Sequence, residues 1–133
     1  MRSENALPKL LGSMQPQLHD ELYVFATTTD AIDLDILRPR LLFVEEEGVT
    51  LVLKKTKAEE HGLQFEFPCR MITLGINSSL DAVGFIAAVT SHLANESISV
   101  NPVSAFFHDH LFIPADQADD AILSIGQLST QFG

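Results

Sequence analysis

Short β-type runs that occur in closely spaced pairs constrain the fold of this 133-residue chain most strongly. In the first pair, residues 41–44 and 49–53 flank a turn that ends in Gly48. In the second pair, residues 99–107 and 111–113 follow each other closely. Two β runs separated by a short link favour an antiparallel hairpin. Because helical segments stand between the hairpins, the pattern predicts an α+β fold rather than repeating βαβ units.

Further elements complete the predicted order. Residues 22–28 and 70–76 have the β-branched and aromatic character of strands. Ser78 or Ser79 can cap a helix over residues 80–95, inside which Gly84 would lie. The sequence contains no linker, so one compact body over residues 1–133 is expected. The other predicted elements are a short helix at 6–11 interrupted by Gly12 and Pro16, a loop or single helical turn at 30–40, a helix from a Thr56–Glu59 capping box to Gly62, and a last helix capped by Asp116.

The charge and the apolar content exclude several classes of partner. Eight Lys and Arg residues stand against 18 Asp and Glu residues, which gives a formal net charge of −10. Because the cations are spread along the sequence, we expect no binding to nucleic acid or to an anionic membrane surface. The longest apolar stretch of the best helix, residues 83–89, is far below the roughly 20 residues that span a bilayer. The N-terminus lacks a secretory pattern and Cys69 is the single cysteine, so a cytoplasmic protein is expected.

The turn Ser78-Ser79-Leu80-Asp81 is the first candidate site. It would join a strand to a helix start, where the first backbone N–H groups are unpaired and carry about half a positive charge. A carboxylate or phosphate can bind at such a place. The alternative is a plain helix cap in which Ser78 and Asp81 bond the backbone. The spacing alone favours the cap.

The segment His108-Asp109-His110 is the second candidate site. Alternate residues of a strand project to one face, so the two imidazoles could share a metal ion if a third ligand approached them. The favoured alternative is a polar corner in which Asp109 bonds its own turn or orients a ligand. The acidic turn Glu45-Glu46-Glu47 is either solvated or recognises an ammonium or guanidinium group.

No strong catalytic signature accompanies these segments. The sequence contains no G-x-S-x-G, P-loop, G-x-G-x-x-G or H-E-x-x-H motif. We therefore expect a protein that is not an enzyme and has no cofactor. A metal-dependent enzyme that uses His108 and His110 is the least favoured alternative.

Five segments, in order, resemble the small bacterial ACT-domain proteins long classed as a domain of unknown function, and they are similar to the ACT modules of cytosolic arginine sensors. The resemblance implies a ferredoxin-like fold, with two ACT-like units in tandem at about residues 12–69 and 70–133 and antiparallel sheets. Each such unit should end in a strand, for which residues 129–133 are too short. The five segments are residues 23–27, 46–52, 72–74, 78–84 and 108–114.

The resemblance also implies a ligand site and a regulatory role. ACT ligands typically lie at an interface, where they touch the loop after the first strand, the start of the first helix and the neighbouring strand. The expected ligand is an amino acid or a related small metabolite. The ligand-bound state would be sensed by a homodimer mate or by a regulatory protein partner. A ligand-free interaction module is the alternative. The expected ligand-binding residues are Ser78, Ser79, Leu80, Asp81, Ala82, Val83, Gly84, His108, Asp109 and Glu47.

Overall fold

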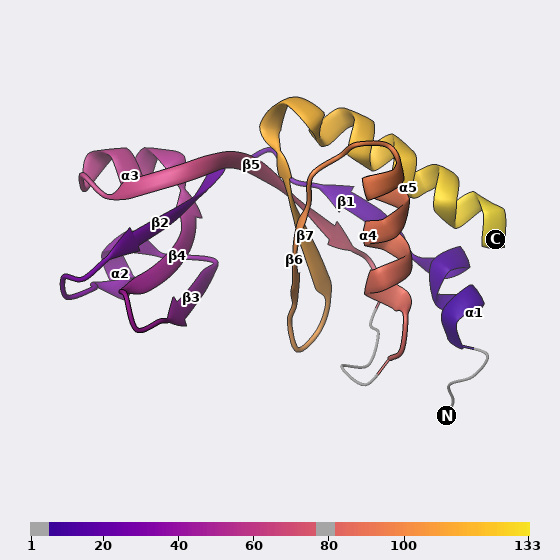
Figure 1. Ribbon diagram of the computed structural model, residues 1–133, viewed down its shortest axis with the longest axis horizontal. Helices are drawn as coiled ribbons and strands as arrows, with labels where there is room; N and C mark the ends of the chain where they lie inside the picture. Colours follow the sequence, from indigo (N-terminus) through magenta and orange to yellow (C-terminus); the bar gives the residue numbers. More distant parts are fainter. Residues whose placement is uncertain (1–5, 77–81) are drawn as a thin grey trace. The chain divides into compact units, whose positions relative to one another are not determined.

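The computed structural model describes residues 6–76 and 82–133, which form two compact units (Figure 1). The central unit is Glu21–Cys69, and the terminal unit is Met1–Asp20 with Arg70–Gly133. Strand β5 (Gln64–Leu74) begins in the central unit and ends in the terminal one. Among the described residues, no helix is long and apolar enough to cross a lipid bilayer. The sequence halves 12–69 and 70–133, and a single compact body over residues 1–133, stay predictions.

The central unit has the element order βαββαβ, with its strands in the spatial order β3-β4-β2-β5. All its strand pairs are antiparallel; for example, Tyr23 lies opposite Lys54 and Leu41 opposite Val52. The strand at 22–28 and the hairpin at 41–53 are therefore confirmed. The elements are β2 (Tyr23–Thr28), α2 (Leu34–Leu37), β3 (Leu41–Val44), β4 (Val49–Lys54), α3 (Lys55–Glu60) and the first part of β5.

The two short helices of the central unit begin and end for different local reasons. Oδ1 of Asp33 accepts hydrogen bonds from the backbone N–H groups of Asp35 and Ile36, at 3.0 and 3.2 Å, and so caps α2. Helix α3 begins at Lys55, directly after β4, and has no side-chain cap. Thr56 therefore lies inside the helix, and the predicted capping box is wrong. Gly62, with a φ of 63°, follows the helix end as predicted.

The terminal unit repeats the same arrangement with one rearranged strand. Its spatial strand order is β6-β7-β5-β1, and the β6–β7 hairpin confirms the second predicted hairpin. Helix α5 packs against α1 and α4. The elements are α1 (Ala6–Ser13), β1 (Pro16–Leu18), the end of β5, α4 (Phe85–Asn95), β6 (Asn101–Ser104), β7 (Asp109–Pro114), the 3₁₀ turn η1 (Ala115–Gln117) and α5 (Ala118–Phe132).

Strand β1 takes the position of a fourth strand, although it comes first in the chain. It pairs antiparallel with β5, with Pro16 opposite Leu74 and Leu18 opposite Ile72. Helix α5 runs to Phe132, so the C-terminus supplies no strand. The sequence therefore correctly predicted the lack of a closing strand at residues 129–133, but it did not reveal that N-terminal residues replace it.

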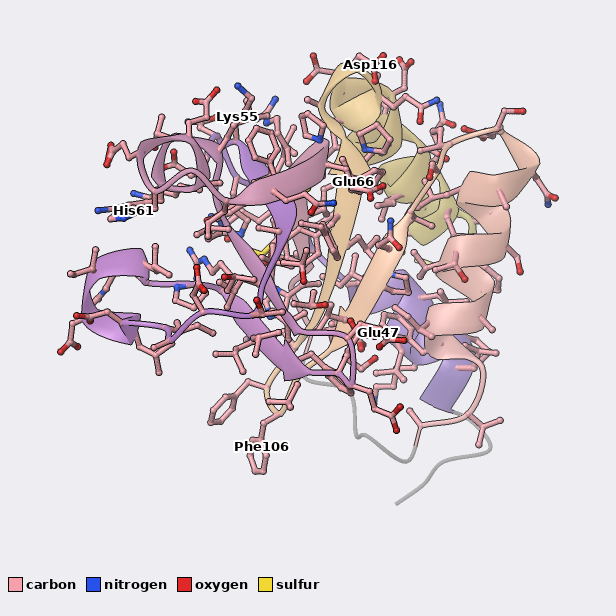
Figure 2. The ribbon with its side chains drawn as sticks, turned by 60° about the vertical axis from the view of Figure 1, so that its left-hand side comes forward. Glu47, Lys55, His61, Glu66, Phe106 and Asp116 are labelled. Carbon is pink, nitrogen blue, oxygen red and sulfur yellow. The ribbon has the colours of Figure 1, made fainter. Side chains whose placement is uncertain are left out.

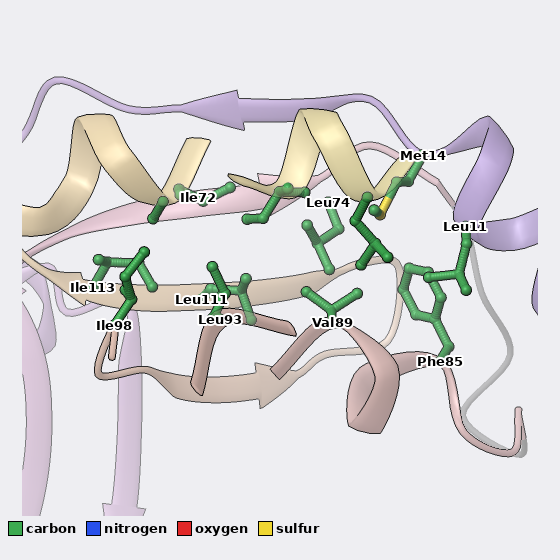
Figure 3. Packing of buried hydrophobic residues seen from close by; sticks show 13 residues of the cluster. Leu11, Met14, Ile72, Leu74, Phe85, Val89, Leu93, Ile98, Leu111 and Ile113 are labelled. Carbon is green, nitrogen blue, oxygen red and sulfur yellow. The ribbon is translucent and has the colours of Figure 1, made fainter. Parts of the chain in front are cut away.

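Each unit has its own apolar core. The central cluster consists of Val24, Ala26, Leu37, Leu51, Leu53 and Ala58. In the terminal unit, β1, β5 and β7 form a sheet onto which α1, α4 and α5 pack apolar side chains (Figure 3). The predicted apolar side of the last helix is confirmed there, since Ala121, Ile125 and Leu128 are buried. The terminal cluster consists of Leu11, Met14, Ile72, Leu74, Phe85, Val89, Leu93, Ile98, Leu111, Ile113, Ala121, Ile125 and Leu128.

Several predicted boundaries are wrong, although the elements exist. Helix α1 continues through Gly12 to Ser13 instead of ending before it. Strand β5 starts at Gln64, six residues before the predicted start at Arg70. Asp116 lies in the 3₁₀ turn η1 and does not cap α5, whose N-cap is Gln117. An α+β fold with antiparallel sheets is nonetheless confirmed.

Candidate functional site

The strand-to-helix segment ends later than the sequence predicted. Ser78, Ser79, Leu80 and Asp81 lie outside the described residues, whereas Ala82, Val83 and Gly84 are described. Helix α4 begins at Phe85, and Gly84 is its N-cap with a φ of 88° and no side-chain hydrogen bond. The predicted helix start at residue 80 is therefore wrong, and Gly84 does not lie inside the helix. Its positive φ is the physical reason, since a right-handed helix requires a negative φ.

The later start moves the free amides of the helix. The carbonyl of Gly84 accepts the first helical hydrogen bond, from the N–H of Ala88 at 2.9 Å. The N–H groups of residues 85–87 therefore have no partner within the helix. An anion drawn to the start of α4 would meet these amides, next to Gly84, and not amides inside the predicted turn. The side chain of Val83 is 88% exposed and does not shield these amides from solvent.

The segment His108-Asp109-His110 forms one end of the β6–β7 hairpin. Asp109 lies opposite Ser104, and the carbonyl of His108 accepts a hydrogen bond from the N–H of Ala105 at 3.0 Å. His108 is half-buried, while Asp109 is only 6% exposed. Asp109 is the one buried carboxylate among residues 6–76 and 82–133. A charge this well shielded from water interacts more strongly with any neighbouring charge or dipole than an exposed one does.

A hydrogen-bonded chain through Thr73 links this corner to β5. Nδ1 of His110 lies 2.9 Å from Oγ1 of Thr73, which lies 2.8 Å from Nε2 of His19. Thr73 is the last residue but one of β5, and His110 is the second residue of β7. The start of β7 therefore lies beside the end of β5, from which the segment leading to α4 departs. The sequence carried no signal for this link, because the three residues are far apart in the chain.

Among residues 6–76 and 82–133, the two imidazoles of the metal alternative have no third ligand. The His108 and His110 ring centroids are 6.3 Å apart, and the ring planes are inclined by 73°. In the part of the chain that the structure describes, no group of three His, Cys, Asp or Glu side chains is placed to hold a metal ion. Thr73, whose hydroxyl bonds Nδ1 of His110, orients that ring.

The acidic turn belongs to the central unit, unlike the other candidate residues. The N–H of Glu45 donates to the carbonyl of Gly48 at 3.0 Å, which closes the β3–β4 hairpin, and the Glu45 carboxylate accepts a hydrogen bond from the Thr50 hydroxyl. Glu47 is exposed (Figure 2). A ligand contact by Glu47 stays a prediction.

Cys69 has the environment of a core thiol. It is fully buried, and its Sγ donates to the backbone carbonyl of Tyr23 at 3.4 Å. Burial raises the pKa of the Cys69 thiol from 9.0 to about 12. Because the thiolate is the nucleophilic form, the native thiol is unreactive near neutral pH.

Comparisons with protein families agree with this architecture. A family model described as an ACT domain matches residues 2–70. A second model with the same description matches residues 65–125. Together they cover both repeats of the fold, so the predicted tandem of ACT units with a ferredoxin-like fold is confirmed. A comparison with curated protein sequences finds no match.

Solved structures show the same fold. A protein of unknown function from Vibrio cholerae, named as a possible transport protein, is 38% identical with a TM-score of 0.84, over 93% of this chain and 96% of that one. A protein from Agrobacterium tumefaciens is 15% identical, with a TM-score of 0.73 over 87% and 89% of the two chains. The ligand-free regulatory subunit of aspartate kinase from Thermus thermophilus is 11% identical, with a TM-score of 0.64 over 89% and 97%. At such low identity, what the last two show of this chain is its fold.

Proposed function

Because the chain belongs to the ACT-domain family, we propose that it is a non-catalytic regulatory protein that binds an amino acid or a related small metabolite. The fold it shares with a regulatory subunit of aspartate kinase supports the regulatory part of this proposal. Binding alone changes nothing downstream, so a second copy or another protein must sense the bound state. We place this protein in the cytoplasm as part of the same proposal.

The proposed ligand site lies in the terminal unit. It comprises Ala82, Val83, Gly84, His108 and Asp109, together with residues 78–81, which the structure does not describe. The observation that carries the proposal is the hydrogen bond between Thr73 and His110, because it brings the strand-to-helix connection and the buried Asp109 to the same end of the sheet. A ligand contact by Glu47 stays part of the proposal.

The proposed chemistry matches the two charges of an amino acid. The α-carboxylate would bind near Gly84, where the first backbone amides of α4 and the positive end of the helix dipole favour an anion. The ammonium group would bind the carboxylate of Asp109, with a charge-assisted hydrogen bond. Because the shielding of Asp109 strengthens such a contact, its carboxylate should contribute most of the discrimination between an amino acid and a simple carboxylic acid.

A ligand-free interaction module is the second candidate, favoured by exposed apolar strands. Phe43 and Val44 of β3 are 62% and 71% exposed, and β3 is an edge strand of the central unit. Phe106 lies at the tip of the β6–β7 hairpin (Figure 2) and is 77% exposed. Its ring packs edge-to-face against that of Phe107. Exposed apolar edges favour pairing with another chain.

A thermal-shift screen with the common amino acids, followed by calorimetric titration, tests the proposed function. A ligand at about 100 times its dissociation constant stabilises the native state by about 2.7 kcal/mol. Asp109→Asn should abolish the shift, because it removes the charge but keeps the shape. Asp116→Asn is the matched control, since Asp116 is exposed on the 3₁₀ turn, and it should leave the shift unchanged.

Backbone NMR shifts then locate the site independently of the variants. The ligand should perturb the amides of residues 82–87 and 108–110. If no amino acid binds and sedimentation shows a stable dimer, the interaction module replaces the binding protein. If an amino acid binds equally well to Asp109→Asn, Asp109 does not belong to the site.

A further inference from the structure

The central unit contains a pocket of about 910 Å³ that no part of the proposed amino-acid site uses. Its walls come from α2 and the segment that follows it, the start of β3, the end of β4 and the first turn of α3. Leu34, Leu37 and Leu41 supply apolar surface. Tyr23, only 3% exposed, forms part of the wall. The volume lies within the range of small-molecule sites, roughly 300–1,000 Å³.

The charge of this pocket is opposite to that of the protein. Four of the eight Lys and Arg residues of the chain line it, namely Arg38, Arg40, Lys54 and Lys57. Asp35 is the one carboxylate in the lining, so four positive charges face one negative charge and the local balance is +3. The whole chain carries −10. Like charges held near one another repel, so an arrangement of this kind is stabilised by a bound anion.

Most of these cations have no counter-ion among the residues that the structure describes. Across residues 6–76 and 82–133, Arg38, Arg40 and Lys57 form no ion pair. Lys54 lies 3.5 Å from Glu21, but both side chains are about half exposed, and such a surface pair contributes little. Three cations are therefore available to a ligand.

Arg40 is held in place for binding. Its Nε donates a hydrogen bond to the Tyr23 hydroxyl at 3.0 Å, and its guanidinium carbon lies 5.9 Å from the centre of the Tyr23 ring. The buried ring thus fixes the guanidinium while its terminal N–H groups remain as donors. A fixed, planar guanidinium suits the paired oxygens of a phosphate or carboxylate.

Arg38 adopts a backbone conformation that is unusual for its type. It ends α2 with a φ of 48° and a ψ of 54°, and its N–H donates to the carbonyl of Leu34 at 2.9 Å. Glycine or asparagine is the common residue in this left-handed position. An arginine here places a second guanidinium in the pocket lining, at the cost of some backbone strain.

We propose that this pocket binds a small organic anion with at least two negative charges, carried by phosphate or carboxylate groups. The anionic groups would bind Arg38, Arg40 and Lys57, and an apolar part of the ligand would contact the leucines. An amino acid without a charged side chain has no net charge and would not balance three cations. The proposal therefore describes a second site, in the other unit, and does not depend on the proposed amino-acid site.

Calorimetric titration with three probes tests this proposal on the whole protein. ATP and citrate represent the phosphate and carboxylate sources, and alanine, which has no net charge, is the comparison. Salt near 0.15 M, where the Debye length is about 8 Å, suppresses long-range attraction. We expect ATP or citrate to bind with a dissociation constant below roughly 1 mM, and the stronger of the two identifies the source chemistry.

Matched variants assign the binding to this pocket. Arg40→Gln combined with Lys57→Gln should raise the dissociation constant of the anion at least about tenfold. Lys55→Gln is the control for Lys57→Gln alone, because each removes one positive charge from α3 (Figure 2), but the Nζ of Lys55 is paired with Glu59 at 2.8 Å and Lys55 does not line the pocket. It should change the affinity by less than about twofold. Arg40→Lys keeps the positive charge but loses the planar guanidinium. Its affinity for the anion should lie between that of the double variant and that of Lys55→Gln.

Three outcomes would overturn the proposal. Neither ATP nor citrate binds to the wild-type protein. Alternatively, Lys55→Gln weakens binding as much as Lys57→Gln does, which would indicate general electrostatic attraction. Finally, the double variant keeps full affinity while far-UV circular dichroism shows that it is folded.

Discussion

The effect of Gly84→Ala on stability distinguishes a helix α4 that includes Gly84 from one that begins after it. The substitution should stabilise the protein in the first case and destabilise it in the second. If Gly84 lay inside a helix over residues 80–95, Gly84→Ala would stabilise the protein by about 0.8–1.0 kcal/mol through helix propensity. In the structure, Gly84 precedes the helix with a φ of 88°. An L-residue in a left-handed conformation costs roughly 1–2 kcal/mol. The same substitution is therefore expected to destabilise the protein.

The magnitude follows from the backbone strain of the folded state and from the restricted unfolded chain, without a steric clash. A Cβ atom at Gly84 would meet its nearest heavy atom, Cδ2 of Leu7, at 3.5 Å, which is an ordinary contact and adds no clash. Alanine also restricts the unfolded chain, which offsets about 0.4–1 kcal/mol of the strain. The net loss is about 1 kcal/mol, and for a chain of this length the melting temperature should fall by roughly 3–5 °C.

Gly126→Ala is the matched control for this measurement. Gly126 lies inside α5, has no positive φ, and a Cβ atom there would meet nothing within 4 Å. It should stabilise the protein by about 0.5–1 kcal/mol. Urea unfolding followed by circular dichroism gives both values under identical conditions. If Gly84→Ala stabilises the protein as much as Gly126→Ala, the helix includes Gly84 and the reasoning is refuted.

Two further predictions concern packing and pH. Gly12→Ala should destabilise the protein by more than about 2 kcal/mol, measured by urea unfolding. The Cβ of the alanine would lie 2.8 Å from the carbonyl carbon of Phe132 and would force α1 away from the end of α5. A loss of stability below about 0.5 kcal/mol would contradict this close approach. The raised pKa of Cys69 means that the native state holds the thiol proton more tightly than the unfolded state, so this contribution to stability is complete below pH 9.0 and declines as the pH rises from 9.0 to about 12. The stability of Cys69→Ala should not show this decline with pH. If the free energy of unfolding depends on pH in the same way in the wild type and in Cys69→Ala, the predicted contribution of Cys69 is wrong.

Local sequence patterns predicted those strands and helices in which the spacing of apolar residues matches the buried face. The hairpin over β3 and β4 followed from two apolar runs and a glycine-containing link, and α5 followed from apolar residues at helical spacing. Gly84 misled the sequence reading because apolar residues on both sides of it continue a helical spacing, while only φ shows that the helix begins after it. The three-residue strand β1, which starts with a proline, is too short to leave a periodic signal.

Candidate sites were predictable only in part. His108, Asp109 and His110 stand out as adjacent residues, yet the burial of Asp109 and the bond from His110 to Thr73 are tertiary facts. The cationic pocket left no sequence signal either. Arg38 and Arg40 lie far from Lys57 along the chain, and their scatter suggested that the positive charges were not gathered.

The sequence by itself determined the fold class, because hydrophobic periodicity and turn residues act over a few neighbouring positions. Tertiary structure alone decided that residues 16–18 supply the fourth strand of the terminal unit, that β7 starts beside the end of β5, and that half of the cations line one pocket. Each of these depends on strand pairing between distant segments. Such pairing is chosen by the burial of whole sheet faces and the position of partner strands, which no local stretch of sequence encodes.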